Sequence, residues 1–288
     1  MADRLTLRIA LGKHDHVAPL RDGRVTSPRI AFEFVDIEPL PKAFRQFVNG
    51  DDLDVSELAV VTHLLAHRFG RPIKGIAIPL WSRLPHTNLV CATDGPIKAP
   101  SDLNGRKVGV RAYGQTSGVW VRGILASDYG VDLGGITWGT MEDAHLPEYE
   151  DPANTRRYAA PPGLRDLMMA GEFAAIMGER VVDPAGIRTV IPDAEQAALD
   201  WIARTGIQPI NHILAVRNAL TDAHPWLPAQ LYGLFDRARA IAVADGAAEP
   251  PPYGLEASRA SLQLAMRFSA EQRITPHEVS VDEMFWPL

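Results

Sequence analysis

Histidines and carboxylates stand where apolar segments of the chain end. His14 and His16 follow the first apolar segment. Glu57 lies inside the apolar segment DVSEL, and His212 precedes another apolar segment. Because histidine transfers protons near neutral pH and a carboxylate can orient an imidazole, these residue types indicate acid–base chemistry. The alternatives are a solvated turn for the His-Asp-His segment, a buried and paired acid or a charge at a helix N-terminus for Glu57, and a core histidine for His212.

A second group of residues is suited to anions. Arg83 and Arg111 each follow a predicted strand, and an arginine holds a carboxylate through paired N–H donors. Gln115, Thr116 and Ser117 stand where a helix is predicted to begin, and the N–H groups of a helix start bind anions. Capping of that helix is the alternative role of the two hydroxyls. The other polar residues at predicted strand ends are Lys13, Ser56, His86, Glu179 and Arg180, the last two of which can also pair with each other.

A metal site is the alternative use of the same histidines. His14 and His16 are two residues apart in a predicted loop, and His86, His212 or Glu57 could complete a ligand set. This spacing permits a divalent metal without requiring one. The chain lacks the GxGxxG, GxxxxGK, GxSxG and HExxH patterns, so no nucleotide loop, nucleophile elbow or zinc-protease helix is predicted.

Strand and helix patterns alternate along the chain, which predicts an α/β fold with mostly parallel sheets. Strands are expected at 5–11, 32–37, 54–60, 73–80, 87–93, 107–110, 136–141, 173–178, 189–191 and 212–216. Helices are expected at 41–49, 62–69, 118–129, 164–170, 193–205, 225–245, 254–274 and 280–285, and an irregular segment at 142–163.

Two such series followed by a return strand predict two lobes. Lobe I is expected to contain 1–93 and 214–288, and lobe II 94–213, with crossovers near 93–98 and 206–213. In open α/β sheets, ligands bind beyond the carboxyl ends of the strands. In a two-lobed molecule those ends face a shared cleft, and this is where the candidate residues are expected to gather.

The composition limits the classes of function. The chain has 288 residues, 46% of them hydrophobic, and a formal net charge of −6. An acidic chain without a basic stripe argues against a nucleic-acid partner. Cys91 is the single cysteine, which excludes an intrachain disulfide and a zinc site with several thiolates. No segment has the length of a membrane span or a signal peptide, so we expect no membrane partner and a cytoplasmic location. A homodimer is an open option.

Read in order, the segments resemble the 4,5-dihydroxyphthalate decarboxylase family. The segments that carry the resemblance are APLRDGRV, DVSEL, IPLWSR followed by His86, SDLNGRKVGV, TSGVWVRGILASDYGV, LRDLMMAGEFAAIMGER, RTGIQPINHILAV, HPWLPAQLY and PYGLEASRASLQLAMRFSAEQ. They cover nearly the whole chain. The resemblance implies the two-lobed α/β fold of type II periplasmic binding proteins, with the ligand cleft between the lobes.

The chain departs from the family at three places. The family tends to read Gly-Asp-Tyr-Asp-Arg after the first strand, whereas this chain reads Gly-Lys-His-Asp-His at 12–16. A Pro-Arg pair is expected where Glu179 and Arg180 stand, and the segment 142–157 has no counterpart. These are expected cleft positions, so the resemblance leaves open which aromatic acid is the substrate.

The resemblance implies non-oxidative decarboxylation of a hydroxylated aromatic carboxylate, a carbon–carbon lyase reaction. A phenol loses its proton, the ring carbon that bears the carboxylate is protonated, and carbon dioxide leaves. An electron-rich ring needs no organic cofactor for this. His16 and His212 are the expected acid–base pair, and Glu57 would orient one of them or accept a hydroxyl proton.

Strand-end position and the resemblance together suggest the substrate contacts. Arg83 and Arg111 are expected to hold carboxylates together with the helix start at Thr116. Lys13, His14, Ser56, His86, Gln115, Ser117, Glu179 and Arg180 complete the expected substrate site. Two other functions remain open: a metal-assisted lyase or hydratase acting on a related hydroxy acid, and a non-catalytic cytoplasmic binding protein for aromatic acids.

Overall fold

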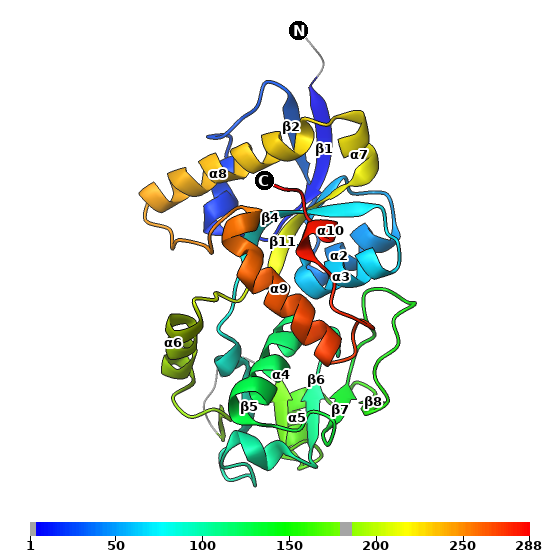
Figure 1. Ribbon diagram of the computed structural model, residues 1–288, viewed down its shortest axis with the longest axis vertical. Helices are drawn as coiled ribbons and strands as arrows, with labels where there is room; N and C mark the ends of the chain where they lie inside the picture. The colour runs from blue at the N-terminus through cyan, green and yellow to red at the C-terminus, as the bar shows by residue number, and fades with distance from the viewer. Residues whose placement is uncertain (1–3, 179–185) are drawn as a thin grey trace. The chain divides into compact units, whose positions relative to one another are not determined.

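The computed structural model describes residues 4–178 and 186–288, and the chain forms two compact units (Figure 1). The first unit consists of Met1–Ser82, Ile210–Gln263 and Val279–Leu288. The second consists of Arg83–Pro209 and Leu264–Glu278. Segments from both halves of the sequence therefore build each unit.

These units differ from the predicted lobes in three segments: 83–93 and 264–278 lie in the second unit, and 210–213 lies in the first. Residues 83–93 lie in the second unit because β5 (Leu89–Ala92) pairs with β9 (Ala175–Met177) and β10 (Ile187–Thr189). Residues 264–278 also lie there, since the Gln272 side-chain amide donates to the carbonyl of Val119 at 2.9 Å.

The first unit is built on a mixed sheet. Its order is β2–β1–β3–β11–β4 in the described part of the chain. β1 pairs in parallel with β2 and β3, whereas β11 runs antiparallel to β3 and β4. The strand bounds are β1 Leu5–Ala10, β2 Ile30–Phe34, β3 Val55–Ala59, β4 Ile73–Trp81 and β11 His212–Arg217.

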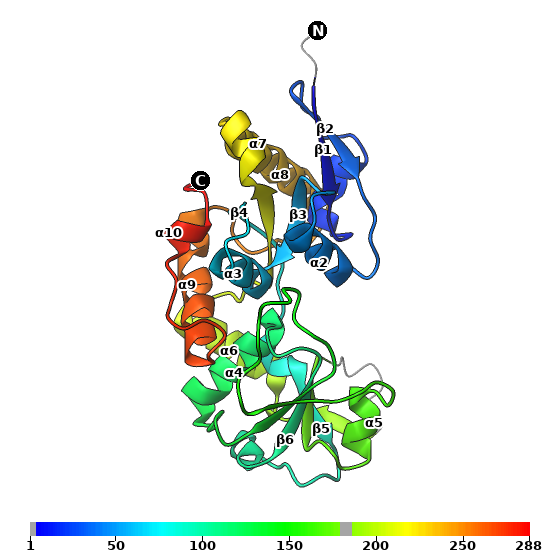
Figure 2. The ribbon, with the colours of Figure 1, turned by 90° about the vertical axis from the view of Figure 1, so that its right-hand side faces the viewer.

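Amphipathic helices cover this sheet. On α8 (Leu227–Ala244), the buried residues Leu231, Leu234, Phe235 and Ala238 follow helical spacing and pack into the same core as β1. Figure 2 shows α2 (Pro41–Asn49) and α3 (Val60–Arg68) beside β3. The shorter helices of the unit are η1 Asp15–Val17, α1 Ala18–Arg21, α7 Asn218–Ala223 and α10 Val281–Met284.

The second unit is also built on a mixed sheet, in the order β10–β5–β9–β6–β7–β8 among the described residues. Its remaining strands are β6 Lys107–Val110, β7 Thr137–Thr140 and β8 Thr155–Arg157. β6 pairs in parallel with β7 and β9, and β7 with β8, while β5 is antiparallel to β9 and β10. The prediction of mostly parallel sheets therefore misses the antiparallel pairs that β11 makes in one unit and β5 in the other.

Helix α4 (Thr116–Tyr129) is the central helix of the second unit, with every residue from Thr116 to Leu125 buried. It ends at Gly130, whose φ of 60° is the left-handed conformation typical of a helix C-terminus. The other helices are η2 Pro85–Asn88, η3 Pro100–Leu103, α5 Leu164–Met169 and α6 Ala194–Thr205, and α9 Leu255–Glu271 contributes residues to both units.

We searched the described residues for a helix that is both long enough and apolar enough to cross a membrane, and found none.

Candidate active site

Glu57 is a fully buried carboxylate in the middle of the first sheet. All five residues of β3 are buried, and strands β1 and β11 flank it on its two sides. The register places Leu214 opposite Glu57, and His212 opposite Ala59 at the end of the strand. The same register places the loop after β1 next to the carboxyl end of β3. Residues from three separate strands therefore meet at Glu57.

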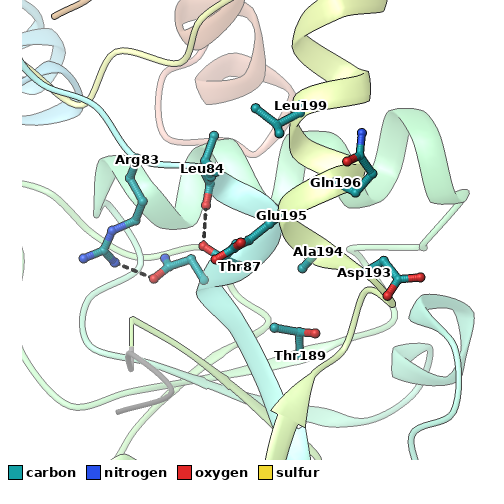
Figure 3. Close-up of a pocket in the computed structure, with 10 residues that line it drawn as sticks. Arg83, Leu84, Thr87, Thr189, Asp193, Ala194, Glu195, Gln196 and Leu199 are labelled. Carbon is teal, nitrogen blue, oxygen red and sulfur yellow. Dashed lines mark hydrogen bonds between the residues drawn. The ribbon is translucent and has the colours of Figure 1, made fainter. Parts of the chain in front are cut away.

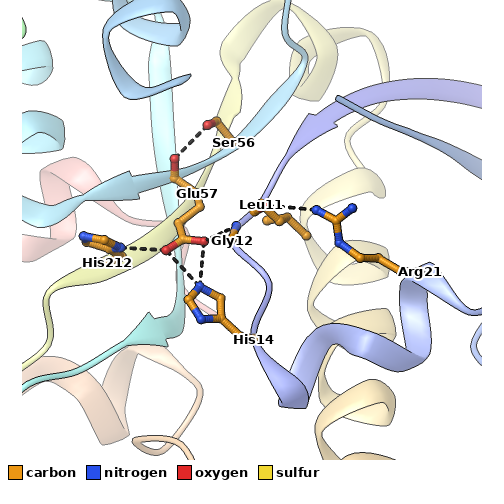
Figure 4. Close-up of polar contacts among 7 residues, drawn as sticks. All are labelled: Leu11, Gly12, His14, Arg21, Ser56, Glu57 and His212. Atoms are coloured by element: carbon orange, nitrogen blue, oxygen red, sulfur yellow. Dashed lines mark hydrogen bonds and ion pairs between the residues drawn. The ribbon is translucent and has the colours of Figure 1, made fainter. Parts of the chain in front are cut away.

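Three donors converge on this carboxylate (Figure 4). The backbone N–H of Gly12 donates to Oε2 at 2.8 Å. His14 Nε2 lies 2.9 Å from Oε2 and 3.1 Å from Oε1, and His212 Nδ1 lies 2.6 Å from Oε1. We call Glu57, His14 and His212 the Glu57 cluster.

Glu57 is ionised in this environment. Burial by itself raises the pKa of a carboxyl group, but the hydrogen bonds from His14 and His212 outweigh it and hold the pKa of Glu57 far below its usual range. An ionised carboxylate only accepts hydrogen bonds, so the imidazole nitrogens that face it carry protons. The ring nitrogens that do not face Glu57 are Nδ1 of His14 and Nε2 of His212. These atoms can accept a proton from a ligand or, in the charged ring, donate one.

The two histidines are accessible, whereas Glu57 is not. The exposed fraction of the side chain is 19% for His14 and 15% for His212, against 0% for Glu57. A ligand can therefore touch the imidazoles, and Glu57 acts on it only through them. Glu57 is accordingly a positioning residue with a fixed negative charge.

Aromatic rings fix the orientation of His212. The Trp81 ring lies 4.7 Å from the imidazole, centroid to centroid, and the buried Phe44 ring meets it edge-on at 5.0 Å. Trp81 reaches this place because β4 pairs with β11 and sets Trp81 opposite His212. Together with the hydrogen bond to Glu57, these contacts restrict the imidazole to one orientation.

His16 supports the cluster from the side. Its ring stacks on His14 with centroids 5.4 Å apart and planes 11° apart. Burial and the neighbouring His14 lower the pKa of His16 to about 4, against the opposing effects of Glu57 and Asp15, so the ring is neutral at pH 7. The structure thus brings His14, rather than His16, into direct contact with Glu57.

Gly12 leaves room for the cluster. A Cβ atom at this position would lie 2.6 Å from His14 Nε2 and 3.0 Å from Glu57 Oε2. Only glycine lets the backbone N–H reach Glu57 while the imidazole occupies the adjacent space. Gly12, Phe44 and Trp81 were missed by sequence reasoning. A glycine before a His-rich loop was the one available signal, since the two aromatic contacts depend on strand register and helix packing.

Other predicted residues of the first unit stand apart from the carboxylate. The Ser56 hydroxyl donates to the backbone carbonyl of Glu57 at 2.7 Å. Because neighbouring residues on a strand point to opposite faces of the sheet, the Ser56 side chain lies on the other face from the Glu57 carboxylate. Lys13 is exposed, with Nζ 3.9 Å from Glu38 Oε1.

The remaining described candidates lie in the second unit. Arg83 Nη1 donates to the side-chain oxygen of Asn88, and Arg111 Nε lies 3.6 Å from Glu142 Oε2. Thr116 and Ser117 are buried in the first turn of α4, and the N-cap residue Gln115 makes no side-chain capping bond. Glu179 and Arg180 lie outside the described residues.

His86 is a core residue of the second unit. It is 2% exposed, with the ring centroids of Tyr129 and Trp201 6.4 and 6.3 Å away. Burial lowers the pKa of His86, against the effect of Asp128. The structure therefore favours a packing role for this ring over the predicted contact with substrate or metal.

We found no arrangement of three or more His, Cys, Asp or Glu side chains that could hold a metal ion within residues 4–178 and 186–288. The His14-x-His16 spacing instead gives one ring on Glu57 and one ring stacked beside it. A metal content measurement on the purified protein is the test of the metal alternative.

The second unit contains a cavity of about 860 Å³ between the segment that leads into β5 and the start of α6 (Figure 3). Arg83, Leu84, Thr87 and Asn88 line one side. Residues of α6, among them Glu195 and Leu199, line the other.

Comparison with solved structures confirms the predicted two-lobed fold of type II periplasmic binding proteins. The periplasmic aliphatic sulphonate binding protein SsuA from Escherichia coli matches with a TM-score of 0.63, covering 99% of this chain and 98% of that protein, at 16% sequence identity. The desulfurization enzyme DSZB matches with a TM-score of 0.57 over 99% of this chain and 97% of that protein, at 15% identity. At these identities the likeness concerns the fold.

Sequence comparison identifies the family. No family model matches the chain. The 4,5-dihydroxyphthalate decarboxylase of Comamonas testosteroni is 32% identical over 254 residues, which cover 83% of this chain and 76% of that enzyme. The enzyme of the same name from Pseudomonas putida is 30% identical over 213 residues, covering 69% of this chain and 82% of that enzyme. The chain therefore belongs to the 4,5-dihydroxyphthalate decarboxylase family.

Proposed function

We propose that the protein is a non-oxidative decarboxylase of a hydroxylated aromatic carboxylic acid and that the Glu57 cluster moves the protons. The observation that carries this proposal is one buried, ionised carboxylate that holds two accessible imidazoles in a chain of this family. Acid–base work needs a group that releases a proton and one that accepts it, and two histidines supply both.

The reaction begins at the ring hydroxyl. One imidazole of the cluster takes the phenol proton, and the negative charge of Glu57 stabilises the imidazolium that forms. The phenolate pushes electron density into the ring and makes the carbon that bears the carboxylate basic. The Trp81 and Phe44 contacts keep the His212 ring in the orientation that this transfer needs.

The second imidazole, in its charged form, delivers a proton to that carbon. The ring loses aromaticity, the bond to the carboxylate breaks, and its electron pair restores the aromatic phenolate as carbon dioxide leaves. The phenolate then takes back a proton. The net change is one proton consumed, one carbon–carbon bond broken and one carbon–hydrogen bond formed. Between the two proton transfers both imidazoles are charged beside the one carboxylate, and the cluster returns to neutral when the second imidazole has delivered its proton.

The wider substrate site stays part of the proposal. We propose that Arg83, Arg111 and the start of α4 at Thr116 bind carboxylates, and that the neutral ring of His16 supports His14. The backbone N–H groups of a helix start carry partial positive charge, which favours an anion there. Arginine adds a two-pronged hydrogen-bond donor of matching shape.

The finer proposals concern substrate and setting. We propose a substrate close to 4,5-dihydroxyphthalate, the compound in the names of the two relatives. We also propose that the reaction serves the breakdown of aromatic acids in the cytoplasm, without an organic cofactor. A homodimer is the proposed assembly, tested by the mass of the protein in solution.

The test is a panel of hydroxylated benzoates and phthalates incubated with the purified protein. The proposal expects carbon dioxide release and loss of ring absorbance with at least one dihydroxylated dicarboxylate. Binding of the panel without any turnover would contradict it and support a binding protein. Activity that disappears on chelation and returns with a metal would contradict it in favour of a metal-assisted lyase.

A further inference from the structure

Arg122 on α4 is a charged residue in the core of the second unit, with 0% of it exposed. As far as the structure describes the chain, its hydrogen bonds go to two neutral acceptors, and its Nη1 has no hydrogen-bond partner. Burial lowers its pKa, against the effects of Tyr113, Tyr149 and Asp151, but a guanidinium stays charged in proteins. Burying a charge among neutral groups is unfavourable, and a neutral side chain of similar length could fill the same space. Packing alone therefore does not account for an arginine here.

The guanidinium holds Tyr113, the middle residue of the loop 111–115 between β6 and α4. Arg122 Nη2 donates to the backbone carbonyl of Tyr113 at 2.6 Å. Arg122 Cζ lies 4.0 Å from the centre of the Tyr113 ring and 5.3 Å from that of the Trp138 ring on β7. A cation is attracted to the face of an aromatic ring. One side chain therefore fixes both the backbone and the ring of Tyr113.

Gln272, the residue after α9, closes the network from the other side. Arg122 Nε donates to Gln272 Oε1 at 2.7 Å, and the Gln272 side-chain amide donates to the carbonyl of Val119 at 2.9 Å. The Tyr113 hydroxyl donates to the backbone carbonyl of Gln272 at 3.2 Å. All four residues belong to the second unit. Connected hydrogen bonds of this kind make a buried region rigid.

We propose that Arg122 is a positioning residue for substrate binding, because it fixes the loop that carries Arg111. This inference rests on the proposed function, in which Arg111 binds a substrate carboxylate. The carbonyl of Arg111 accepts the backbone N–H groups of Met141 and Glu142 at 3.0 and 2.8 Å. One end of the loop is thus held by the residues after β7, and Arg122 holds its middle. A loop that is ordered before the ligand arrives loses less freedom on binding, which raises affinity.

Gly118 brings the guanidinium close to the first turn of α4. A Cβ atom at position 118 would lie 2.9 Å from Arg122 Nη1. The positive charge of Arg122 therefore lies beside the helix start that is proposed to bind a carboxylate, where it adds to the partial positive charge of the backbone N–H groups. The position of the loop and the charge beneath the helix start favour the same ligand, an anion.

The experiment compares the full-length wild-type protein with Arg122→Met. The dissociation constant of 4,5-dihydroxyphthalate is measured by calorimetry in the Glu57→Gln background, which stops the proposed turnover. KM and kcat for carbon dioxide release are measured without that substitution. We expect the dissociation constant and KM to rise about tenfold, the size of coupling within one hydrogen-bond network. We expect kcat to stay within about twofold, since the Glu57 cluster belongs to the first unit.

A role in folding alone would give the opposite pattern. Fewer active molecules lower the apparent kcat and leave KM and the dissociation constant unchanged. Ile124→Val, which removes a buried methylene group from α4, is the control for lost stability and should not change the dissociation constant. Arg106→Met makes the same substitution at an exposed arginine of the second unit and should not change it either.

Arg122→Lys keeps the charge but lacks the planar fork of donors. Its dissociation constant should lie between those of the wild type and Arg122→Met. This variant also keeps the test valid if Arg122→Met fails to fold.

Arg111→Gln tests the route by which Arg122 acts. Residues that act through one another give substitution effects that do not add. With Arg111→Gln already in place, we expect Arg122→Met to raise the dissociation constant by no more than about threefold.

Two results would overturn the inference. One is an unchanged dissociation constant in a folded Arg122→Met protein. The other is a tenfold rise that persists undiminished in the Arg111→Gln background. A protein that binds 4,5-dihydroxyphthalate without releasing carbon dioxide would contradict the proposed function, and its dissociation constants would still decide the role of Arg122.

Discussion

Glu57 shows how one residue can organise a site that it does not expose. A carboxylate buried without partners would take up a proton, because transfer of its charge out of water is unfavourable. Here three N–H donors surround it and keep it charged. The same bonds determine which nitrogen of each imidazole is directed away from it and toward a ligand. One set of hydrogen bonds therefore both stabilises the buried charge of Glu57 and orients the two imidazoles.

Gly12→Ala tests this arrangement at a single atom. The added Cβ would lie 2.6 Å from His14 Nε2, so the imidazole must move away from Glu57. We expect kcat to fall by about 10²-fold, within the usual contribution of a positioned acid or base. Thermal unfolding is the accompanying measurement, and it separates a loss of activity from a loss of the fold. Full activity in a folded Gly12→Ala protein would contradict the role of His14 in the Glu57 cluster.

At the scale of elements, buried polar groups and close helix contacts decide how the secondary structures pack. His63 on α3 is fully buried, its two ring nitrogens have no hydrogen-bond partner among the described residues, and its ring meets Phe285 at 5.1 Å. Gly123 on α4 stands where a side chain would collide with α9, since its Cβ would lie 2.1 Å from Phe268 Cδ2. Each contact fixes one helix against its neighbours.

His63 predicts acid sensitivity. Burial lowers the pKa of His63 to about 3, with smaller effects of the same sign from His67 and Lys74. Its pKa in the unfolded chain is about 6.5, so the unfolded state takes up the proton first as the pH falls. Stability that is present above pH 6.5 is then lost toward pH 3, at up to about 1.4 kcal/mol per pH unit. The free energy of unfolding in urea should differ less between pH 7 and pH 5 for His63→Leu than for the wild type. An equal difference in the two proteins would show that His63 is not the origin of the acid sensitivity.

Gly123→Ala and Gly233→Ala form a matched pair of helix substitutions. Alanine at position 123 must displace Phe268, which costs roughly 1–3 kcal/mol and outweighs the better helix propensity. Alanine at position 233 on α8 meets its nearest atom, Arg237 Nη1, at 3.7 Å and should stabilise the protein by up to ~1 kcal/mol. Free energies of unfolding from urea titrations check both signs. Stabilisation by both substitutions would contradict the close approach of α4 and α9.

At the scale of the whole molecule, segments far apart in the sequence share each unit. The final residues of the chain complete the first unit: Phe285 forms a β-bridge with Gly75, and the Trp286 N–H donates to the carbonyl of Gly75 at 2.9 Å. The second unit likewise takes residues 264–278 from the last quarter of the chain. Each unit therefore needs a segment from the last quarter of the chain to be complete.

Phe285→Ala tests this dependence. Phe285 is 1% exposed, and truncation of a buried phenylalanine costs roughly 3–5 kcal/mol. We expect a loss of that size in the free energy of unfolding. Glu283→Ala, on an exposed residue of the same segment, should change stability by less than ~0.5 kcal/mol and serves as the control. Equal effects of the two substitutions would contradict a core role for Phe285.

Much of the fold could be predicted from local patterns, because β3 and β11 are apolar runs of strand length and α8 and α9 follow helical periodicity. The antiparallel strand pairs could not be predicted, because strand direction depends on the path of the chain between strands. The short helix α7 at Asn218–Ala223 was missed because six residues carry little periodic signal.

The site was predictable in its residue types but not in its pairing. Strand-end position singled out Glu57 and His212, and the structure places these two residues in contact across the β3–β11 pair. Which of His14 and His16 contacts Glu57 depends on the turn after β1. Because the two histidines are only two residues apart in a loop, the sequence leaves either ring possible as the partner. His86 follows a strand in the same way, yet aromatic neighbours from α4 and α6 enclose it.

The most direct test of the account compares carbon dioxide release from 4,5-dihydroxyphthalate by the wild-type protein and by Glu57→Gln. Glutamine keeps the shape of the side chain but loses its charge and one acceptor oxygen. We predict turnover by the wild type, a loss of 10²-fold or more in kcat for Glu57→Gln, and no loss for Glu150→Gln, an exposed control. Equal rates for all three proteins would contradict the proposed role of the Glu57 cluster.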